Sequence, residues 1–527
     1  MNQTIADIVN SLYGLEVEVV LSRPEPQFGD LATNVAMQLA KRLGKNPRQI
    51  AEEIIEQLLT DQDIIEASVA GPGFINLRLA DTALIRQVYT RPTLGRQGQV
   101  VVIETNNPNP FKPMHIGHAY NAVLADTMAN LLAVSGADAK RVSYHGDVGA
   151  HVGKSIWALL NYCDGEPSKL DEIVPEDRNE FMGKMYALGA KKYQEDEAIR
   201  AQIDELARQS FERTDKLYAE IYQRVYDWSF EQIDATVKRL GNLPTEQRYL
   251  ESQADPIGVA TVKENVPNVF KQSDGALVFE GSKHGSFDNA FVGSNGRGLY
   301  AARDLGLIQL KAKDYPEMKQ SIVVTGGEQA AYFKGVIAAA ELALPTLSGK
   351  LVNYPTGLVK LSTGKMSSRT GEVVTIDWLF DAFRAAIKRR GGETEEAIVA
   401  GALRYQFLKV KIGGDVVFDV NEAVSLSGNT GSYLQYAHAR ARRIIEKSTA
   451  EFSMPRELFE EDRSLVRKLG EFHEIVDVAT RGLEPHPPDR RGPRRRGRAA
   501  LGRGGSRSRT GPARRAPRAR GARRAWP

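Results

Sequence analysis

The chain has 527 residues and a single cysteine, Cys163. One cysteine excludes a disulfide framework and any zinc cluster built from cysteines, and it suits a reducing cytosol. The sequence also lacks any run of about 20 apolar residues, the length that a transmembrane helix needs. Its first residues, MNQT, lack the charged and apolar segments of a signal peptide. We therefore expect a cytoplasmic protein with three or four domains.

Basic residues are concentrated at the C-terminus. Residues 487–527 contain 15 arginines, one aspartate and no lysine, so the 70 basic and 66 acidic residues of the whole chain leave 55 and 65 before them. An arginine-rich tail suggests a nucleic-acid-binding arm. However, 35 of its 41 residues are Arg, Gly, Ala or Pro, types with codon families that begin with two G or C bases. Our hypothesis is that a frameshift near His486 produced this tail, and we expect it to be disordered.

Three regions are predicted before the tail. Residues 1–90 are expected to form a small α+β domain. Residues 96–390 alternate strand-like runs with helices, which is typical of a doubly wound, Rossmann-like α/β domain with a parallel sheet. Residues 393–486 are expected to be all-α and, if the tail is a frameshift product, truncated.

The individual elements follow from apolar periodicity. Helices are predicted over 31–43, 50–58, 398–408, 433–447 and 458–479, and strands over 74–77, 100–103, 141–144 and 321–324. A truncated last region would leave an apolar stripe of its final helix exposed. The members of that stripe are Leu465, Leu469, Ile475 and Val476.

The segment NPNPFKPMHIGHAYNAVLAD, residues 107–126, places two histidines around one glycine, His115-Ile116-Gly117-His118. The predicted strand 100–103 precedes it, and apolar residues then recur at helical spacing. The histidines should therefore lie on the first turn of a helix that follows a parallel strand. Open α/β sheets bind nucleotides there, because the helix N-terminus offers free N–H groups to phosphate. Alone, an H-x-G-H pattern is weak, since it also arises by chance.

A second motif, GKMSSRTG, spans residues 364–371. Small hydroxyl residues, two cations and flanking glycines suit a mobile loop that wraps a polyphosphate, although alone they fit a basic surface turn equally well. The two motifs, in this order in one α/β domain, resemble the H-I-G-H and K-M-S-K-S signatures of class I aminoacyl-tRNA synthetases. Here Ser368 stands at the second lysine of the signature and Arg369 follows, which leaves the division of labour between Lys365 and Arg369 open.

Further segments resemble arginyl-tRNA synthetases across nearly all of residues 1–486. They are Gln27-Phe28-Gly29-Asp30, Glu104–Asn109, Gly146-Asp147-Val148-Gly149 with Val148 at the family's usual Trp, Tyr300–Asp304 and Thr430–Arg440. The resemblance implies that the chain activates L-arginine with ATP and Mg²⁺ and transfers it to the 3′ end of tRNA(Arg), releasing pyrophosphate and AMP. This chemistry needs positioning and electrostatic stabilisation rather than a protein nucleophile. A monomer without a tightly bound protein metal is expected.

The resemblance also implies roles for individual residues. Candidates for ATP binding and catalysis are His115, Gly117, His118, Lys365, Met366, Ser367, Ser368 and Arg369. Candidates for arginine binding are Glu104, Asn109, Gln329, Tyr300, Asp304 and Glu251. The last three are assigned to the guanidinium, which carboxylates and a phenol hold well, and Tyr300 and Asp304 lie one helical turn apart.

The flanking domains are implied to bind tRNA, the N-terminal one at the tRNA elbow and the helical one at the anticodon. The candidate contacts are Phe28, Asn34, Tyr433 and Gln435. Phe28 could equally be core, and Tyr433 and Gln435 could be interface structure. Three other readings stay open, namely another class I synthetase such as the glutamyl or cysteinyl enzyme, a stand-alone nucleotidyltransferase, and a non-enzymatic RNA-binding protein.

Overall fold

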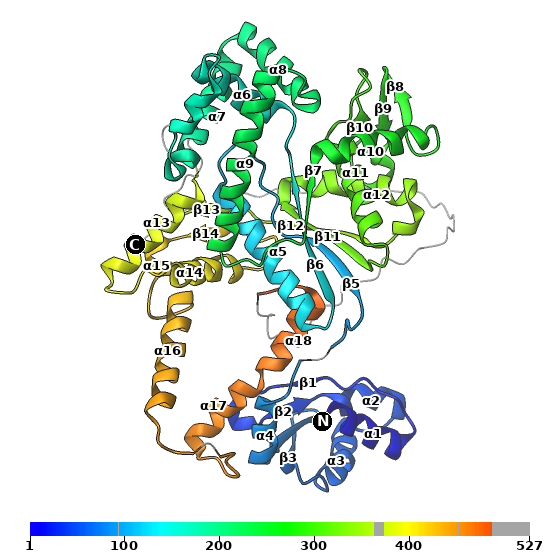
Figure 1. Cartoon of the computed structure of the whole chain (residues 1–527). Helices are drawn as coiled ribbons and strands as arrows, with labels where there is room; N and C mark the ends of the chain where they lie inside the picture. The colour runs from blue at the N-terminus through cyan, green and yellow to red at the C-terminus, as the bar shows by residue number, and fades with distance from the viewer. Residues whose placement is uncertain (93, 363–373, 452, 487–527) are drawn as a thin grey trace, which may run out of the picture. The chain divides into compact units, whose positions relative to one another are not determined.

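The computed structural model describes residues 1–486 except 93, 363–373 and 452 (Figure 1). Two predictions therefore lie outside the described residues. One is the disordered tail 487–527, and the other is the phosphate-wrapping loop with Lys365, Met366, Ser367, Ser368 and Arg369. Of the helices in the described part of the chain, none has both the length and the apolar character that a membrane crossing requires.

The N-terminal region is an α+β domain built on an antiparallel sheet of order β1-β2-β4-β3. Its elements are α1 (Asn2–Tyr13), β1 (Leu21–Ser22), η1 (Pro26–Phe28), β2 (Leu31–Thr33), α2 (Val35–Leu43), α3 (Pro47–Leu58), β3 (Ile64–Ala70), β4 (Phe74–Leu79) and α4 (Asp81–Val88). The helix predicted over 31–43 is wrong in its first turn. Residues 31–33 instead pair with β4 as a strand, and Asn34 caps the shorter helix α2.

The central region is built on a five-stranded sheet in which every neighbouring pair is parallel. Its order is β12-β11-β5-β6-β7, with β5 (Val100–Glu104), β6 (Asp138–His145), β7 (Gln247–Leu250), β11 (Gln320–Gly326) and β12 (Leu351–Thr356). The chain moves outward from β5 through β6 to β7 and later returns to the other side of β5. This reversal confirms the doubly wound fold, and such a switch point is where open α/β sheets bind ligands.

Helices cover the sheet, which explains why strand β5 reads as an uninterrupted apolar run. Val101, Val102 and Ile103 are all fully buried, since a parallel strand of this kind is covered on both faces. Helix α5 (Ile116–Val134) follows β5 and contributes to one core cluster, while Val102 belongs to a second cluster with α11 (Tyr300–Asp314) and α12 (Ala330–Ala343).

Two insertions complete the region. The first is helical, with α6 (Ala150–Cys163), η2 (Pro167–Glu172), η3 (Pro175–Asp177), α7 (Arg178–Glu195), α8 (Glu197–Glu212) and α9 (Lys216–Arg239). The second follows α10 (Glu251–Glu264) and is an antiparallel sheet of β8 (Lys271–Ser273), β9 (Ala276–Phe279) and β10 (Asn289–Val292), with η4 (Gly281–His284). The remaining elements are η5 (Gly327–Gln329), η6 (Pro345–Leu347) and β13 (Val359–Leu361).

The last region is mainly helical, as predicted. Its elements are α13 (Ile376–Arg389), α14 (Glu396–Leu408), β14 (Val416–Phe418), α15 (Val420–Ala423), α16 (Gly431–Lys447), α17 (Glu460–Gly470) and α18 (Phe472–Gly482). Strand β14, which pairs with β13, departs from the all-α character expected of residues 393–486. The single helix predicted over 458–479 is wrong, because the helix breaks at Glu471. The two halves pack on different partners, α17 on α4 and α18 on α5.

The exposed stripe on these helices is found for three of its four members. Leu465, Leu469 and Ile475 are 59%, 49% and 39% exposed, whereas Val476 is half-buried.

Candidate active site

Helix α5 begins at the two histidines. His115 is the N-cap, and its Nδ1 accepts a hydrogen bond from the N–H of Gly117 at 3.2 Å. His118 returns the interaction, because its Nδ1 accepts from the N–H of His115 at 3.2 Å. The two rings stack with their centroids 3.7 Å apart. A Cβ at Gly117 would lie 3.1 Å from the His115 ring, so the glycine makes room for this fold-back.

Both histidines are neutral at physiological pH. Burial and the nearby Lys112 ammonium lower the pKa of His115 to about 4. Burial, then the charges of His115 and Lys112, lower the pKa of His118 well below its usual value. Because each Nδ1 accepts from the backbone, the ring proton of each neutral imidazole sits on Nε2. The first turn of α5 therefore presents neutral N–H donors.

A cavity of about 510 Å³ opens beside this turn. It reaches the carboxyl ends of β5, β6 and β11, where the order of the sheet reverses. Of the described ATP candidates, His118 lines it, while His115 and Gly117 do not. The structure brings all six arginine candidates to this one cavity. They are Glu104, Asn109, Glu251, Tyr300, Asp304 and Gln329.

One face of helix α11 forms a wall of the cavity. Tyr300 begins the helix and is 64% exposed. Asp304, Leu307, Ile308 and Lys311 follow it along the same face. Asp304 follows Tyr300 by four residues, and the other three residues follow Asp304 by three, four and seven. These are the spacings of a single helical face. The predicted pairing of Tyr300 with Asp304 is thus part of a longer wall.

Glu104, at the end of β5, already has a partner. Lys311 Nζ lies 2.5 Å from its Oε1, and both side chains are 3% exposed. Asn107 Nδ2 donates to Oε2 at 2.7 Å. A carboxylate with its charge matched in this way anchors α11 to β5, and less of its hydrogen-bonding capacity remains for a ligand.

Glu251 and Asp255 both form ion pairs with the guanidinium of Arg303. Arg303 Nη1 lies 2.8 Å from Glu251 Oε2, and its Nε lies 3.0 Å from Asp255 Oδ1. The rings of Phe211 and Tyr300 lie 5.2 Å and 5.4 Å from this guanidinium. Burial raises the pKa of Glu251, and Arg303 opposes the rise. The candidate second carboxylate for the substrate is therefore engaged by a resident arginine.

Asp304 differs from these acids. Among the described residues, no lysine or arginine forms an ion pair with it, and the hydroxyl of Tyr332 donates a hydrogen bond to its Oδ2 at 2.5 Å. Burial raises the pKa of Asp304 to about 7, against the lowering effect of Tyr332. A half-buried carboxylate that lines a cavity and lacks a cation is a site where a cationic ligand gains most, since the ligand supplies the missing charge.

Three family models match successive parts of the chain. Residues 80–418 match the family described as "tRNA synthetases class I (R), catalytic domain". The chain belongs to this family. Residues 1–79 match the "Arginyl tRNA synthetase N terminal domain", and residues 434–487 match the "DALR anticodon binding domain".

Individual relatives give the same picture over most of the chain. An arginine–tRNA ligase of Porphyromonas gingivalis is 27% identical and covers 92% of this chain and 89% of its own length. One of Borreliella burgdorferi is 28% identical, with coverages of 88% and 83%. The structure of Thermus thermophilus arginyl-tRNA synthetase is 26% identical, with a TM-score of 0.73 over 92% of this chain and 88% of that one. The structure of the Plasmodium falciparum enzyme shares the fold at 17% identity, with a TM-score of 0.71 and coverages of 91% and 87%.

In this class I synthetase, the tRNA candidates fall into two groups. Phe28 is 54% exposed and Tyr433 is 42% exposed, so both rings are available to a partner. Asn34 is the N-cap residue of α2, and its Oδ1 accepts a hydrogen bond from Gln38 Nε2 at 2.7 Å rather than from the helix backbone. Gln435 Nε2 donates to the carbonyl of Ile398 on α14 at 3.2 Å. The two amides thus have structural contacts inside the synthetase, which favours the interface reading for Gln435.

Sequence reasoning missed three cations of this synthetase. Arg303 directly precedes Asp304 in the sequence but was not predicted as a site residue. Lys311 follows Asp304 by seven residues, a helical spacing that could have placed it on the same face as Asp304. Lys112, three residues before His115, lines both the main cavity and a neighbouring one of about 220 Å³. Burial lowers the pKa of Lys112, and Glu251 opposes this change.

Proposed function

We propose that the chain is an arginine–tRNA ligase, which joins L-arginine to the 3′ end of tRNA(Arg) at the expense of ATP. One observation carries the proposal. A single cavity joins His118, at the N-terminus of α5, to Asp304, a half-buried carboxylate that lacks a cation partner among the described residues. The first feature suits a nucleotide phosphate, and the second suits a guanidinium.

The reaction proceeds in two transfers. The carboxylate of arginine attacks the α-phosphorus of ATP, and pyrophosphate leaves with the electron pair of the broken P–O bond. A hydroxyl of the terminal ribose of tRNA then attacks the activated carbonyl, and AMP leaves. Neither step needs a protein nucleophile, so the chain contributes positioning and stabilisation of charge that develops on phosphate.

Each candidate residue has a proposed task. Asp304 and Tyr300 bind the guanidinium, and Asn109 and Gln329 bind the amino and carboxylate end of arginine. His115 and His118 donate from Nε2 to the phosphates, and Gly117 lets their turn approach the nucleotide. Lys365 and Arg369, with Met366, Ser367 and Ser368, belong to the loop that closes on pyrophosphate.

Glu104 and Glu251 are better suited to positioning than to a full charge pair with the substrate. Each already contacts a cation of the chain, Lys311 and Arg303 respectively. Both acids line the cavity, so a remaining lone pair can still accept a hydrogen bond from arginine.

Magnesium enters as part of the MgATP substrate. Across the described residues, no cluster of three or more His, Cys, Asp or Glu side chains is arranged to hold a metal ion. The phosphates of ATP are therefore the ligands we propose for Mg²⁺. tRNA(Arg) is the macromolecular partner, and a cytoplasmic monomer remains our expectation.

Arginine-dependent exchange of pyrophosphate into ATP, followed by charging of tRNA(Arg), tests the proposal. Exchange is measured both with and without tRNA. We expect arginine to support the reaction, and citrulline, its uncharged isostere, to fail because Asp304 requires a cation. Equal activity with glutamate or cysteine, or no exchange under either condition, would contradict the proposal.

A further inference from the structure

The segment Gln27-Phe28-Gly29-Asp30 turns two side chains to different environments. Phe28 is 54% exposed, whereas Asp30 is 4% exposed. Between them, Gly29 has a φ of 116°, and a Cβ there would lie 2.7 Å from the carbonyl oxygen of Leu77. The N–H of Asp30 donates to the same carbonyl at 2.7 Å. The segment is therefore pressed onto strand β4, and only glycine fits between the exposed ring and the buried acid.

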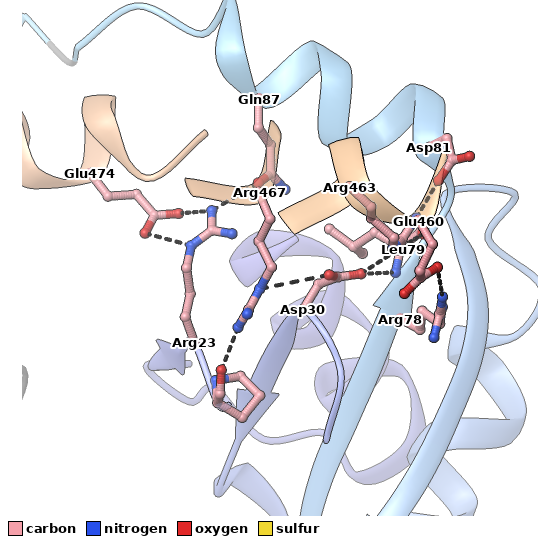
Figure 2. Close-up of polar contacts among 11 residues, drawn as sticks. Arg23, Asp30, Arg78, Leu79, Asp81, Gln87, Glu460, Arg463, Arg467 and Glu474 are labelled. Atoms are coloured by element: carbon pink, nitrogen blue, oxygen red, sulfur yellow. Dashed lines mark hydrogen bonds and ion pairs between the residues drawn. The ribbon is translucent and has the colours of Figure 1, made fainter. Parts of the chain in front are cut away.

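Asp30 meets helix α17 from the far end of the chain (Figure 2). Arg463 Nη2 lies 2.6 Å from its Oδ2, and Arg467 Nε lies 3.7 Å from its Oδ1. Both arginines are 8% exposed. Asp30 Oδ2 also accepts from the N–H of Leu79 at 2.8 Å. One carboxylate thus connects the strand that supports Phe28 to a helix more than 400 residues away in sequence.

Arg463 and Arg467 make further contacts with the N-terminal domain. Together with the Asp30 pairs, these contacts form the joint between α17 and that domain. Arg463 also pairs with Asp81 and donates to the carbonyl of Leu79 at 2.7 Å. Arg467 donates to the carbonyl of Pro24, four residues before Phe28. The buried positive charge is therefore shared between two carboxylates, and removing one leaves a guanidinium incompletely paired, which is costly in a buried site.

Small and apolar residues of α17 fit the same surface. Val466 packs against the core of the N-terminal domain. A Cβ at Gly470 would lie 3.1 Å from Cβ of Gln87, so α17 and α4 approach closely there. Figure 2 shows the resulting cluster of polar contacts, with Arg23 and Glu474 at its edge, 2.7 Å apart. Helix α17 is thus docked by both packing and charge.

We propose that Asp30 is a positioning residue for tRNA binding. By holding α17 with its buried carboxylate, it fixes the segment that presents the Phe28 ring to the tRNA. The N-terminal domain and the helical region that matches an anticodon-binding family are then joined as one tRNA-binding unit. This inference rests on the proposed function, because it takes tRNA(Arg) as the ligand of Phe28.

A double-mutant cycle on the full chain tests the proposal. The dissociation constant of tRNA(Arg) is measured by filter binding for the wild type, Asp30→Asn, Phe28→Ala and the double variant. We expect each single change to weaken binding about tenfold, the scale of one lost aromatic contact with a base. The double variant should bind about as weakly as either single one, because both changes remove the same contact. A hundredfold loss in the double variant, or no loss in Asp30→Asn, would overturn the proposal.

A second variant and a matched control separate positioning from general damage to the fold. Arg463→Gln acts from the helix side and changes no residue of strands β2 and β4, and it should reproduce the loss seen with Asp30→Asn. The control is Arg78→Gln, at an exposed pair with Glu460 at 3.4 Å on the rim of the same joint, where binding should change less than twofold. Equal losses in the control and in Arg463→Gln would count against the proposal.

Steady-state charging gives a further readout. The tRNA KM should rise in Asp30→Asn while the arginine KM stays within twofold, because the arginine cavity lies on other elements. A parallel rise of both constants would contradict a positioning role. If the wild-type chain binds tRNA(Arg) but charges none, the proposed function fails, whereas the binding cycle still decides the role of Asp30.

Discussion

The two ends of the active-site cavity use different chemistry. At the N-terminus of α5, His115 and His118 are neutral donors whose pKa values lie below their usual range. At the α11 end, the cavity carries acidic side chains, which differ in their partners. Glu104 and Glu251 find theirs in the chain, but Asp304 is paired with no cation of the described residues. On this comparison, we expect a charged ligand to bind at the carboxylate left without a cation, rather than wherever carboxylates are most numerous.

The largest expected effect comes from Asp304→Asn. This change removes the negative charge that the substrate guanidinium would neutralise, and the new amide can turn an N–H toward it. We expect a loss of about 3–5 kcal/mol of transition-state stabilisation, which lowers kcat/KM for arginine about 150- to 5,000-fold, mainly through KM. Pyrophosphate exchange over a range of arginine concentrations measures it. An unchanged arginine KM would remove Asp304 from the pocket.

At the opposite end, His118→Ala should lower kcat and leave arginine affinity nearly intact. The lost Nε2–H donor acts on charge that develops on phosphate, so we expect a cost of about 2–4 kcal/mol, about 30- to 1,000-fold. His115→Ala should act in the same direction and also remove the N-cap of α5. Circular dichroism checks that the fold persists. Near-full arginine-dependent exchange in both variants would refute the assignment of this helix terminus.

Acidification should separate the two ends. The ordinary pKa of an Asp is 3.8, and burial raises that of Asp304 to about 7, so its carboxyl is largely protonated below pH 7 when no ligand is bound. A neutral carboxyl cannot pair with a guanidinium. The arginine KM should therefore rise by up to about tenfold per pH unit as pH falls from 7 to 6, and level off above pH 8.

The KM for ATP should stay flat over the same range, because both histidines remain neutral there. The Asp304→Asn variant is the matched control, since its arginine KM should lose the dependence on pH. Burial also raises the pKa of Glu251. If the arginine KM of the Asp304→Asn variant still depended on pH, Glu251 rather than Asp304 would be the group that titrates.

The smallest effect is expected for Asp255→Asn. Asp255 shares Arg303 with Glu251, and the loss of its charge leaves Arg303 with one full carboxylate partner. We expect the arginine KM to rise only about threefold, the size of one hydrogen bond to a charged group that is partly replaced. An effect as large as that of Asp304→Asn would show that Arg303 is essential to the pocket. It would contradict the expectation that paired acids matter less for arginine binding than Asp304.

Much of the fold could be predicted from local pattern. The uninterrupted apolar run at β5 and the helical spacing after His115 gave the doubly wound sheet, because burial on two faces removes polar residues from a strand. Two errors in the elements have a common cause. Residues 31–33 form a strand because β4 pairs with them, and the predicted helix 458–479 breaks at Glu471 because its halves dock on α4 and α5. Tertiary contacts of this kind leave no trace in local periodicity.

The site was predictable in its residue types but not in its pairings. The motifs placed Glu104, Glu251 and Asp304 in the candidate pocket, and the structure brings them to one cavity. Their partners come from distant parts of the chain, since Lys311 lies 207 residues from Glu104 and Arg303 lies 52 residues from Glu251. Only the folded chain shows which acid remains available. The same holds for Asp30, whose motif suggested a tRNA contact and whose carboxylate is buried against α17.

The α11 wall has a consequence for redesign of substrate choice. One face of the 15-residue helix α11 carries Tyr300 at its first position, then Asp304, and then Lys311, which pairs with Glu104 on the sheet. Tyr300 and Asp304 can be substituted without disturbing the Lys311–Glu104 ion pair, since Lys311 lies more than a full helical turn beyond Asp304. A library limited to positions 300, 304, 307 and 308 would thus explore new amino-acid side chains on a fixed frame, with activation chemistry at α5 left as it is.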